Sequence, residues 1–170
     1  MKTKAAGAVT VATLAWAAWL TVVPLIAAAN PGTVALVAVA VTYRAGALIC
    51  HQIPDRSFHL AGVQVPVCAR CLGLYAGAAA GAVAAFAWAW RRERKGAALR
   101  APLSRVRAVI IILIGATAAL WVGEQLGVIA LSRGVRFAAA LPPGMAVGAM
   151  VALWAGGAAI DDNAGGSAIH

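Results

Sequence analysis

The chain has 170 residues, of which 63% are hydrophobic and only 11% are charged, and its formal net charge is +9. Soluble domains carry about a quarter charged residues, so this composition indicates an integral membrane protein rather than a soluble enzyme. The distribution of this positive charge argues against nucleic-acid binding. Half of the basic residues lie in one segment, RRERKGAALRAPLSRVR, which is typical of a loop beside anionic lipid.

The first 30 residues predict a retained transmembrane helix. Two lysines precede an apolar run over Ala5–Ala29, and the letters AAAN at its end resemble a signal-peptide cleavage site. The apolar core of a signal peptide is shorter than this run, which is long enough to cross a bilayer. We therefore expect the segment to stay in the protein as its first membrane span.

Five apolar stretches predict an all-α integral membrane bundle of about five transmembrane helices. Lipid offers no hydrogen bonds to the backbone, so each stretch must be helical. We expect one transmembrane domain over residues 1–160 and a flexible tail over residues 161–170. The expected spans are Ala5–Ala29, Thr33–Ile49, Val67–Trp90, Val106–Leu131 and Phe137–Ile160.

Three glycines in the third span predict close packing against another helix. Gly73, Gly77 and Gly81 are spaced four apart, so they share one helix face. Small residues at this spacing let two membrane helices approach closely. Cys68 and Cys71 fall on the roughly opposite face, where their sulfurs would be free for chemistry.

Five crossings would place the N-terminus on the same side as the loop Cys50–Pro66 and the turn Leu131–Arg136. Each side would then carry seven Lys and Arg residues. The dense loop Arg91–Arg107 favours the cytoplasm for its own side, whereas the two N-terminal lysines favour the opposite orientation. We expect the cytoplasmic loop, which leaves the Cys50–Pro66 side extracytoplasmic in a prokaryotic cell.

Charged residues gather at the end of the bundle that carries the loop Cys50–Pro66. Ionisable groups in membrane spans usually face a protein interior or a wet cavity, so Glu124 is expected to pair with a nearby arginine. Glu124 and Asp55 are the candidate carboxylate bases, and Asp55 is better explained as an ion-pair partner. The charge network, which is also a candidate anion site, comprises Arg44, Arg56, Arg70, Arg133, Arg136 and Glu124.

The cysteines and histidines of the same region predict a metal site. Cys68 and Cys71 form a C-x-x-C pair, and Cys50 with His51 completes the three thiolates and one imidazole that suit zinc. Adjacent side chains diverge, so Cys50 or His51 alone is a possible ligand, and His59 is an alternative fourth ligand. Three cysteines are one fewer than iron–sulfur clusters usually require.

Two other interpretations of the cysteines stay open. A C-x-x-C at a helix N-terminus has a lowered thiol pKa, which suits thiol–disulfide exchange with Cys50 as a resolving partner, as in small membrane oxidoreductases that reduce quinones. The simplest alternative is a buried thiol cluster or a structural disulfide.

The letters CHQIPDRSF and PVCARCLGLYAG resemble the signature of a family of small prokaryotic integral membrane proteins known as a domain of unknown function. The resemblance covers about Tyr43–Gly148 and implies a multi-helix membrane protein with a shared Cys/His/Arg face, but it implies no activity. The letters GEQLG and SRGVR depart from the family's usual acidic and Asn-x-x-Arg motifs. Matching positions are Cys50, His51, Gln52, Arg56, Ser57, Cys68, Arg70, Cys71 and Gly73.

The sequence thus predicts a membrane bundle with a zinc-like Cys/His site at one interface and an Arg/Glu cluster beside it. Membrane lipids are its expected surroundings, and a lipid phosphate or a small carboxylate is a possible anionic ligand. The alternatives are a thiol–disulfide oxidoreductase and a structural or accessory membrane subunit. The residues assign no oligomeric state and do not decide whether a metal would be catalytic.

Overall fold

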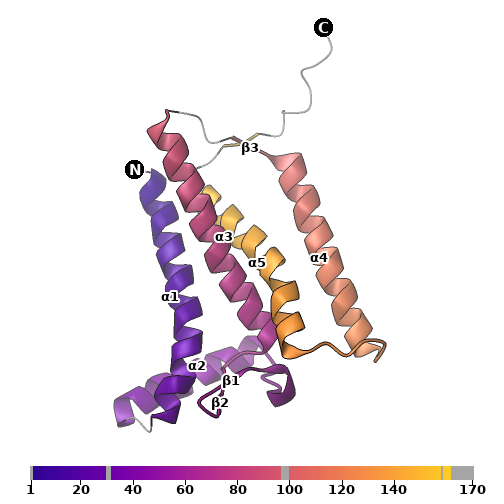
Figure 1. Ribbon diagram of the computed structural model, residues 1–170. Helices are drawn as coiled ribbons and strands as arrows, with labels where there is room; N and C mark the ends of the chain where they lie inside the picture. The colour runs from indigo at the N-terminus through magenta and orange to yellow at the C-terminus, as the bar shows by residue number, and fades with distance from the viewer. Residues whose placement is uncertain (1, 30–31, 97–99, 158, 162–170) are drawn as a thin grey trace.

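The computed structural model describes residues 2–29, 32–96, 100–157 and 159–161, and it is an all-α membrane bundle, as the sequence predicts (Figure 1). All five predicted apolar stretches form helices. The helices are α1 (Lys2–Ala28), α2 (Thr33–Ile49), α3 (Ala69–Arg94), α4 (Leu103–Gln125) and α5 (Arg133–Ala155).

Short elements connect the helices at both ends of the bundle. Between α2 and α3 the chain makes a 3-10 turn and an antiparallel hairpin, and at the opposite end two strands pair in parallel and join the start of α4 to the end of α5. Of the predicted tail 161–170, only Asp161 lies within the described residues. The elements are Pro54–Arg56 (the 3-10 turn), β1 (His59–Leu60), β2 (Val63–Gln64), β3 (Arg100–Pro102) and β4 (Ala159–Asp161).

Within the described residues four helices, not five, are long and apolar enough to cross a membrane: α1, α3, α4 and α5. The exception is α2, whose 17 residues rise only about 26 Å, less than the roughly 30 Å of hydrocarbon. Figure 1 shows α2 lying across the end of the bundle rather than along it. Its inner side is anchored there, because the indole Nε1–H of Trp19 donates to the hydroxyl of Thr42 over 3.0 Å.

The orientation of α2 changes which ends of the chain share a side. The first turn of α1 lies at the same end of the bundle as the last turn of α3 and the first turn of α4 (Figure 1). The expectation that the N-terminus lies on the side of the loop Cys50–Pro66 is therefore wrong. That expectation assumed that α2 crosses the membrane. Without this crossing, α1 alone separates the N-terminus from the loop Cys50–Pro66, so the two lie on opposite sides.

The centre of the bundle is the contact between α3 and α5, and glycines on both helices make it close. Seen from α3, a Cβ atom added at Gly73, Gly77 or Gly81 would collide with a backbone carbonyl of α5. Seen from α5, the same holds for Gly144 and Gly148 against carbonyls of α3. The predicted glycine face is confirmed, and it lets two helix backbones touch where lipid provides no hydrophobic drive for association.

The other two spans differ in how firmly they pack. Helix α1 lies against both α3 and α5 and buries Leu20 and Val23 almost completely. By contrast, Glu124 is the only buried residue of Ala108–Gln125, the part of α4 that could cross the membrane, whereas 39% of the corresponding window of α3 is buried. Figure 1 shows α4 standing beside α5 as the outermost helix. It is therefore held mainly at its ends.

The glycine contact yields a first prediction. Gly77→Ala should destabilise the protein by about 1–3 kcal/mol, because the new methyl group overlaps the carbonyl oxygen of Leu141 and lies 3.0 Å from the amide nitrogen of Met145. The matched control is Gly115→Ala on α4, where an added Cβ meets nothing within 4 Å. The apparent Tm in detergent measures both. Equal melting temperatures would show that the α3–α5 contact is not limited by backbone approach.

Candidate metal centre

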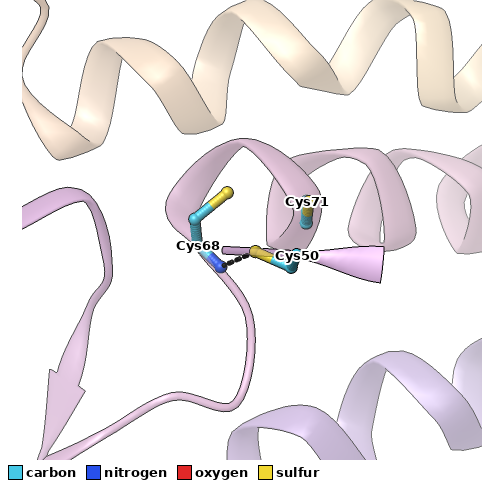
Figure 2. A group of neighbouring side chains, drawn as sticks. All are labelled: Cys50, Cys68 and Cys71. Carbon is cyan, nitrogen blue, oxygen red and sulfur yellow. Dashed lines mark hydrogen bonds between the residues drawn. The ribbon is translucent and has the colours of Figure 1, made fainter. Parts of the chain in front are cut away.

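Three cysteine sulfurs meet at the end of the bundle where α2 ends and α3 begins. Cys50 follows the last residue of α2, Cys68 precedes the first residue of α3, and Cys71 lies in the first turn of α3 (Figure 2). All three thiols are free, and their Sγ atoms lie within 4.8 Å of one another. A tetrahedral zinc ion with Zn–S bonds of about 2.3 Å needs its sulfurs about 3.8 Å apart. Shifts well under 1 Å would therefore let the three sulfurs bind one metal ion.

The chain positions Cys50 by folding tightly around the end of α2. The side-chain amide of Gln52 donates to the carbonyl oxygens of Tyr43 and Pro66 over 2.8 and 2.7 Å. Gln52 itself has a φ of 49°, in the left-handed region that non-glycine residues rarely adopt. A Cβ at Gly46 would meet the carbonyl oxygen of Pro66, so this crossing of chain segments requires glycine.

A second glutamine ties the hairpin to the same turn. The amide of Gln64 donates to the carbonyl oxygen of Gln52 over 2.6 Å and to the hydroxyl of Ser57 over 3.2 Å, while the hydroxyl of Tyr43 donates to the carbonyl of Gln64. Ser57 is fully buried and donates to the carbonyl of Ile53. Sequence reasoning did not identify Tyr43 or Gln64 as parts of the site, because their partners lie 21 and 12 residues away.

The beginning of α3 provides a favourable electrostatic environment for thiolates. The amide N–H of Cys68 donates to the sulfur of Cys50 over 3.1 Å (Figure 2). A hydrogen bond with the side chain of Cys71 lowers the pKa of the Cys68 thiol to about 5, with further help from backbone amides of α3 and from Cys50 and against the effect of burial. A helix N-terminus stabilises negative charge in the same way. The lowered pKa favours the thiolate form of Cys68, the form that binds metals and attacks disulfides.

The histidines lie outside this group of sulfurs. His51 and His59 are both exposed, and neither ring nitrogen lies close enough to all three sulfurs to belong to the cluster. His51 does line the cavity beside the cysteines, whereas His59 lies on β1 of the hairpin. The structure therefore brings together three of the four predicted ligands, and the role of His51 as the fourth stays a prediction.

A cavity of about 730 Å³ opens beside the three sulfurs. Its walls come from the end of α2, the following turn, and the facing ends of α3, α4 and α5, so it lies where the helices reach the membrane boundary. Besides the three cysteines it is lined by Ile49, His51, Gln52, Ile53, Arg56, Arg70, Trp121, Glu124, Gln125 and Arg136. Sulfur, guanidinium and carboxylate groups therefore share one space.

One carboxylate organises the charged wall of this cavity. The side chain of Glu124 on α4 is only 2% exposed and forms ion pairs with Arg70 of α3 and Arg136 of α5, whose side chains are 18% and 13% exposed. Two nitrogens of Arg136 lie 2.6 Å from Oε1, while Arg70 approaches Oε2. Pairing of Glu124 with Arg136 agrees with the prediction that Glu124 meets an arginine. The pair with Arg70 was not foreseen.

The candidate role of Glu124 as a catalytic base stays a prediction, and its surroundings give it a different task. Both carboxylate oxygens accept hydrogen bonds from guanidinium groups, and a base must keep a lone pair directed at its substrate. The geometry therefore makes Glu124 a positioning residue that fixes Arg70 and Arg136 at the cavity wall.

The remaining predicted cluster members are spread over the same end of the bundle. Arg56 is half-buried and lines the cavity. Arg133 is exposed and donates from Nε to the backbone carbonyl of Asp55 over 3.1 Å, which ties the start of α5 to the 3-10 turn. Arg44 is exposed on α2 and is not among the residues that line the cavity. The predicted charge network thus reduces to Arg56, Arg70, Glu124 and Arg136 at the cavity itself.

Comparison with known proteins finds relatives that match short segments of the chain. The chain is 49% identical over 41 residues to "Uncharacterized protein MJ1492" of Methanocaldococcus jannaschii, a match that covers 24% of this chain and 26% of that protein. It is 53% identical over 30 residues to an "Uncharacterized protein" of Methanothermobacter thermautotrophicus, covering 18% of this chain and 27% of the relative. The chain therefore matches only about a quarter of the length of each relative. No solved structure matches it.

Residues 50–150, well over half of the chain, match the model of a family described as "Predicted membrane protein (DUF2085)". The matched range contains all three cysteines and the cavity residues Arg56, Arg70, Glu124 and Arg136. It also agrees with the resemblance drawn from the sequence motifs. The chain belongs to this family of predicted membrane proteins.

Proposed function

We propose that this membrane protein holds a thiophilic metal ion, zinc, at Cys50, Cys68 and Cys71 and binds an anionic ligand in the cavity beside it. The observation that supports this most directly is the approach of three free sulfurs to within 4.8 Å of one another at the wall of that cavity.

The donor set favours zinc over other metals. Thiolates are soft ligands that suit zinc, copper(I) or iron–sulfur clusters, and three of them are too few for the usual four-cysteine cluster. Three thiolates leave one position of a tetrahedral zinc ion to another ligand. His51 and any molecule in the cavity both compete for that position, because both face the same space. A bound zinc ion would act there as a Lewis acid.

Charge balance at the cavity supports an anionic ligand. Among the described residues that line it, three guanidinium groups stand against one carboxylate, so these side chains carry a net charge of +2. A zinc ion with three thiolates carries a formal charge of −1, which still leaves the wall net positive. Guanidinium groups bind carboxylates and phosphates through paired, charge-assisted hydrogen bonds. A ligand with one negative charge would neutralise the site.

Thiol–disulfide exchange is the second candidate, and the acidic thiol of Cys68 favours it. Two of the three thiols would form a disulfide and release two electrons and two protons to a quinone-type acceptor. The approach of all three sulfurs favours metal binding instead, because a disulfide uses two sulfurs and needs them about 2.05 Å apart.

The four-span arrangement gives an asymmetric distribution of basic residues. Lys2 and Lys4 now lie at the same end of the bundle as the seven basic residues of Arg91–Arg107, which makes nine on that side against five on the cysteine side. The basic side of a membrane protein usually faces the cytoplasm. The corrected count therefore favours an extracytoplasmic metal centre much more strongly than the tie obtained with five spans.

The metal proposal predicts the outcome of single substitutions. Cys50→Ser, Cys68→Ser and Cys71→Ser should each weaken zinc binding more than about 100-fold, beyond what the loss of an outer hydrogen-bond partner costs. His51→Ala should retain zinc, because its ring lies outside the sulfur group. Elemental analysis and titration of purified protein measure this. Full zinc retention in the cysteine variants, or a metal-free protein with one reducible disulfide, would contradict the proposal.

The shared carboxylate predicts a stability effect. Glu124→Gln should destabilise the protein by about 3 kcal/mol, because two partly buried guanidinium groups lose their counterion. The control is Glu93→Gln, an exposed position in the last turn of α3. The apparent Tm in detergent, measured at low and high salt, compares the two. If both variants melt like the wild type, Glu124 does not hold α4 to its neighbours.

The topology can be tested with reporters placed on the two sides. Alkaline phosphatase inserted after Gly62, in the exposed turn of the hairpin, should be active, because that enzyme matures only outside the cytoplasm. Green fluorescent protein inserted after Gly96 should be fluorescent, because that loop should be cytoplasmic. Exchanging the two reporters should abolish both signals. The reverse pattern would place the metal centre in the cytoplasm.

A further inference from the structure

A second cavity, of about 440 Å³, lies between α4 and the α3–α5 pair. Its wall on α4 runs from Ile114 to Trp121, and its wall on α5 includes Pro143 and Val147. Apart from Arg70 and a threonine, all of its lining side chains are apolar. Because α3, α4 and α5 are all candidate spans, this cavity lies at the depth of the hydrocarbon chains.

The apolar cavity adjoins the metal-side cavity. Arg70 and Trp121 line both of them, so the two spaces meet at these side chains. Trp121 lies one turn before Glu124 on α4, at the level where tryptophan commonly marks the membrane interface. From there to Ile114 the helix rises about 10 Å, roughly a third of the hydrocarbon thickness. The combined space is thus charged at the interface and apolar toward the membrane centre.

We propose that the two cavities together bind one anionic lipid, with its headgroup beside Arg56 and Arg70 and one hydrocarbon chain in the groove along α4. This inference rests on the proposed anion site and names its ligand class. A small soluble anion would use the charged cavity alone and would give no reason for an apolar continuation. A lipid satisfies both, since its charge lies at the interface and its chain points into the bilayer.

The loose packing of α4 makes the groove accessible from the bilayer. Between Ala108 and Gln125 only Glu124, near the end of the helix, is buried, so a chain can enter sideways between the rest of α4 and its neighbours. A second copy of this chain could also cover α4, but it would bring no negative charge to Arg56 and Arg70 unless an acidic residue lay at its own interface. The positive wall therefore favours the lipid over the second copy.

The test compares two lipids with identical oleoyl chains on the full chain in neutral detergent, with zinc supplied during purification and the bound zinc measured. Native mass spectrometry should show that phosphatidylglycerol binds at least about tenfold more tightly than phosphatidylcholine, the effect of about one charge-assisted contact. Arg56→Gln should reduce this preference to near onefold. Arg44→Gln, on the same end of the protein but away from the cavity, should keep it.

The chain groove is tested separately. Ala118→Trp should fill it and weaken binding of both lipids, whereas Ala116→Trp, about 200° around the same helix, should leave binding unchanged. Glycerol 3-phosphate, which lacks chains, should not displace phosphatidylglycerol at equal concentration. Equal binding of the two lipids, displacement by glycerol 3-phosphate, or a dimer that only Ala118→Trp dissociates would each overturn the lipid proposal.

Zinc content separates this inference from the proposed metal site. All four variants keep the three cysteines and should retain zinc. If zinc is bound but the lipid preference is absent, the lipid inference fails and the metal centre stands. If the preference is present in a protein that binds no zinc, the metal proposal fails and the lipid site stands.

Discussion

The ion pairs of Glu124 hold the outermost span in place. Glu124 is itself the only buried residue of α4 between Ala108 and Gln125, and a bilayer gives apolar helices no hydrophobic reason to associate. A carboxylate shared with Arg70 of α3 and Arg136 of α5 therefore supplies much of what fixes the end of α4. The same contact sets the wall of the cavity, so the position of α4 and the charge of the site depend on one side chain.

The cysteine cluster depends on a different device, a hydrogen-bonded turn between α2 and α3. Gln52 reaches back to the carbonyl of Tyr43 and across to that of Pro66, which places Cys50 next to the first turn of α3. The amides at that helix end then stabilise charge on sulfur. Because α2 lies across the end of the bundle, it places Cys50 beside α3 without crossing the membrane. The end of α2 also forms one wall of the cavity.

Much of this arrangement could be predicted from the sequence, and the failures have specific causes. Spacing predicted the glycine face of α3, and the set of metal-ligand side chains predicted the approach of Cys50 to the C-x-x-C pair. Spacing did not predict the partner of Arg70, because periodicity identifies a face of a helix but not which neighbour lies there. The orientation of α2 was also missed, since composition gives no tilt and its anchor, the bond between Trp19 and Thr42, joins residues 23 apart.

The strand pair β3–β4 adds a mechanical property to this design. It joins the start of α4 to the end of α5, while Glu124 secures the opposite end. Helix α4 is therefore held at both ends and free to bend between them. The gap along its middle is then set by whatever occupies it and by the lateral pressure of the surrounding bilayer. Changes in membrane thickness or composition would bend α4 before the other spans, and the change would be transmitted to the cysteine cluster through the end of α4 at Glu124.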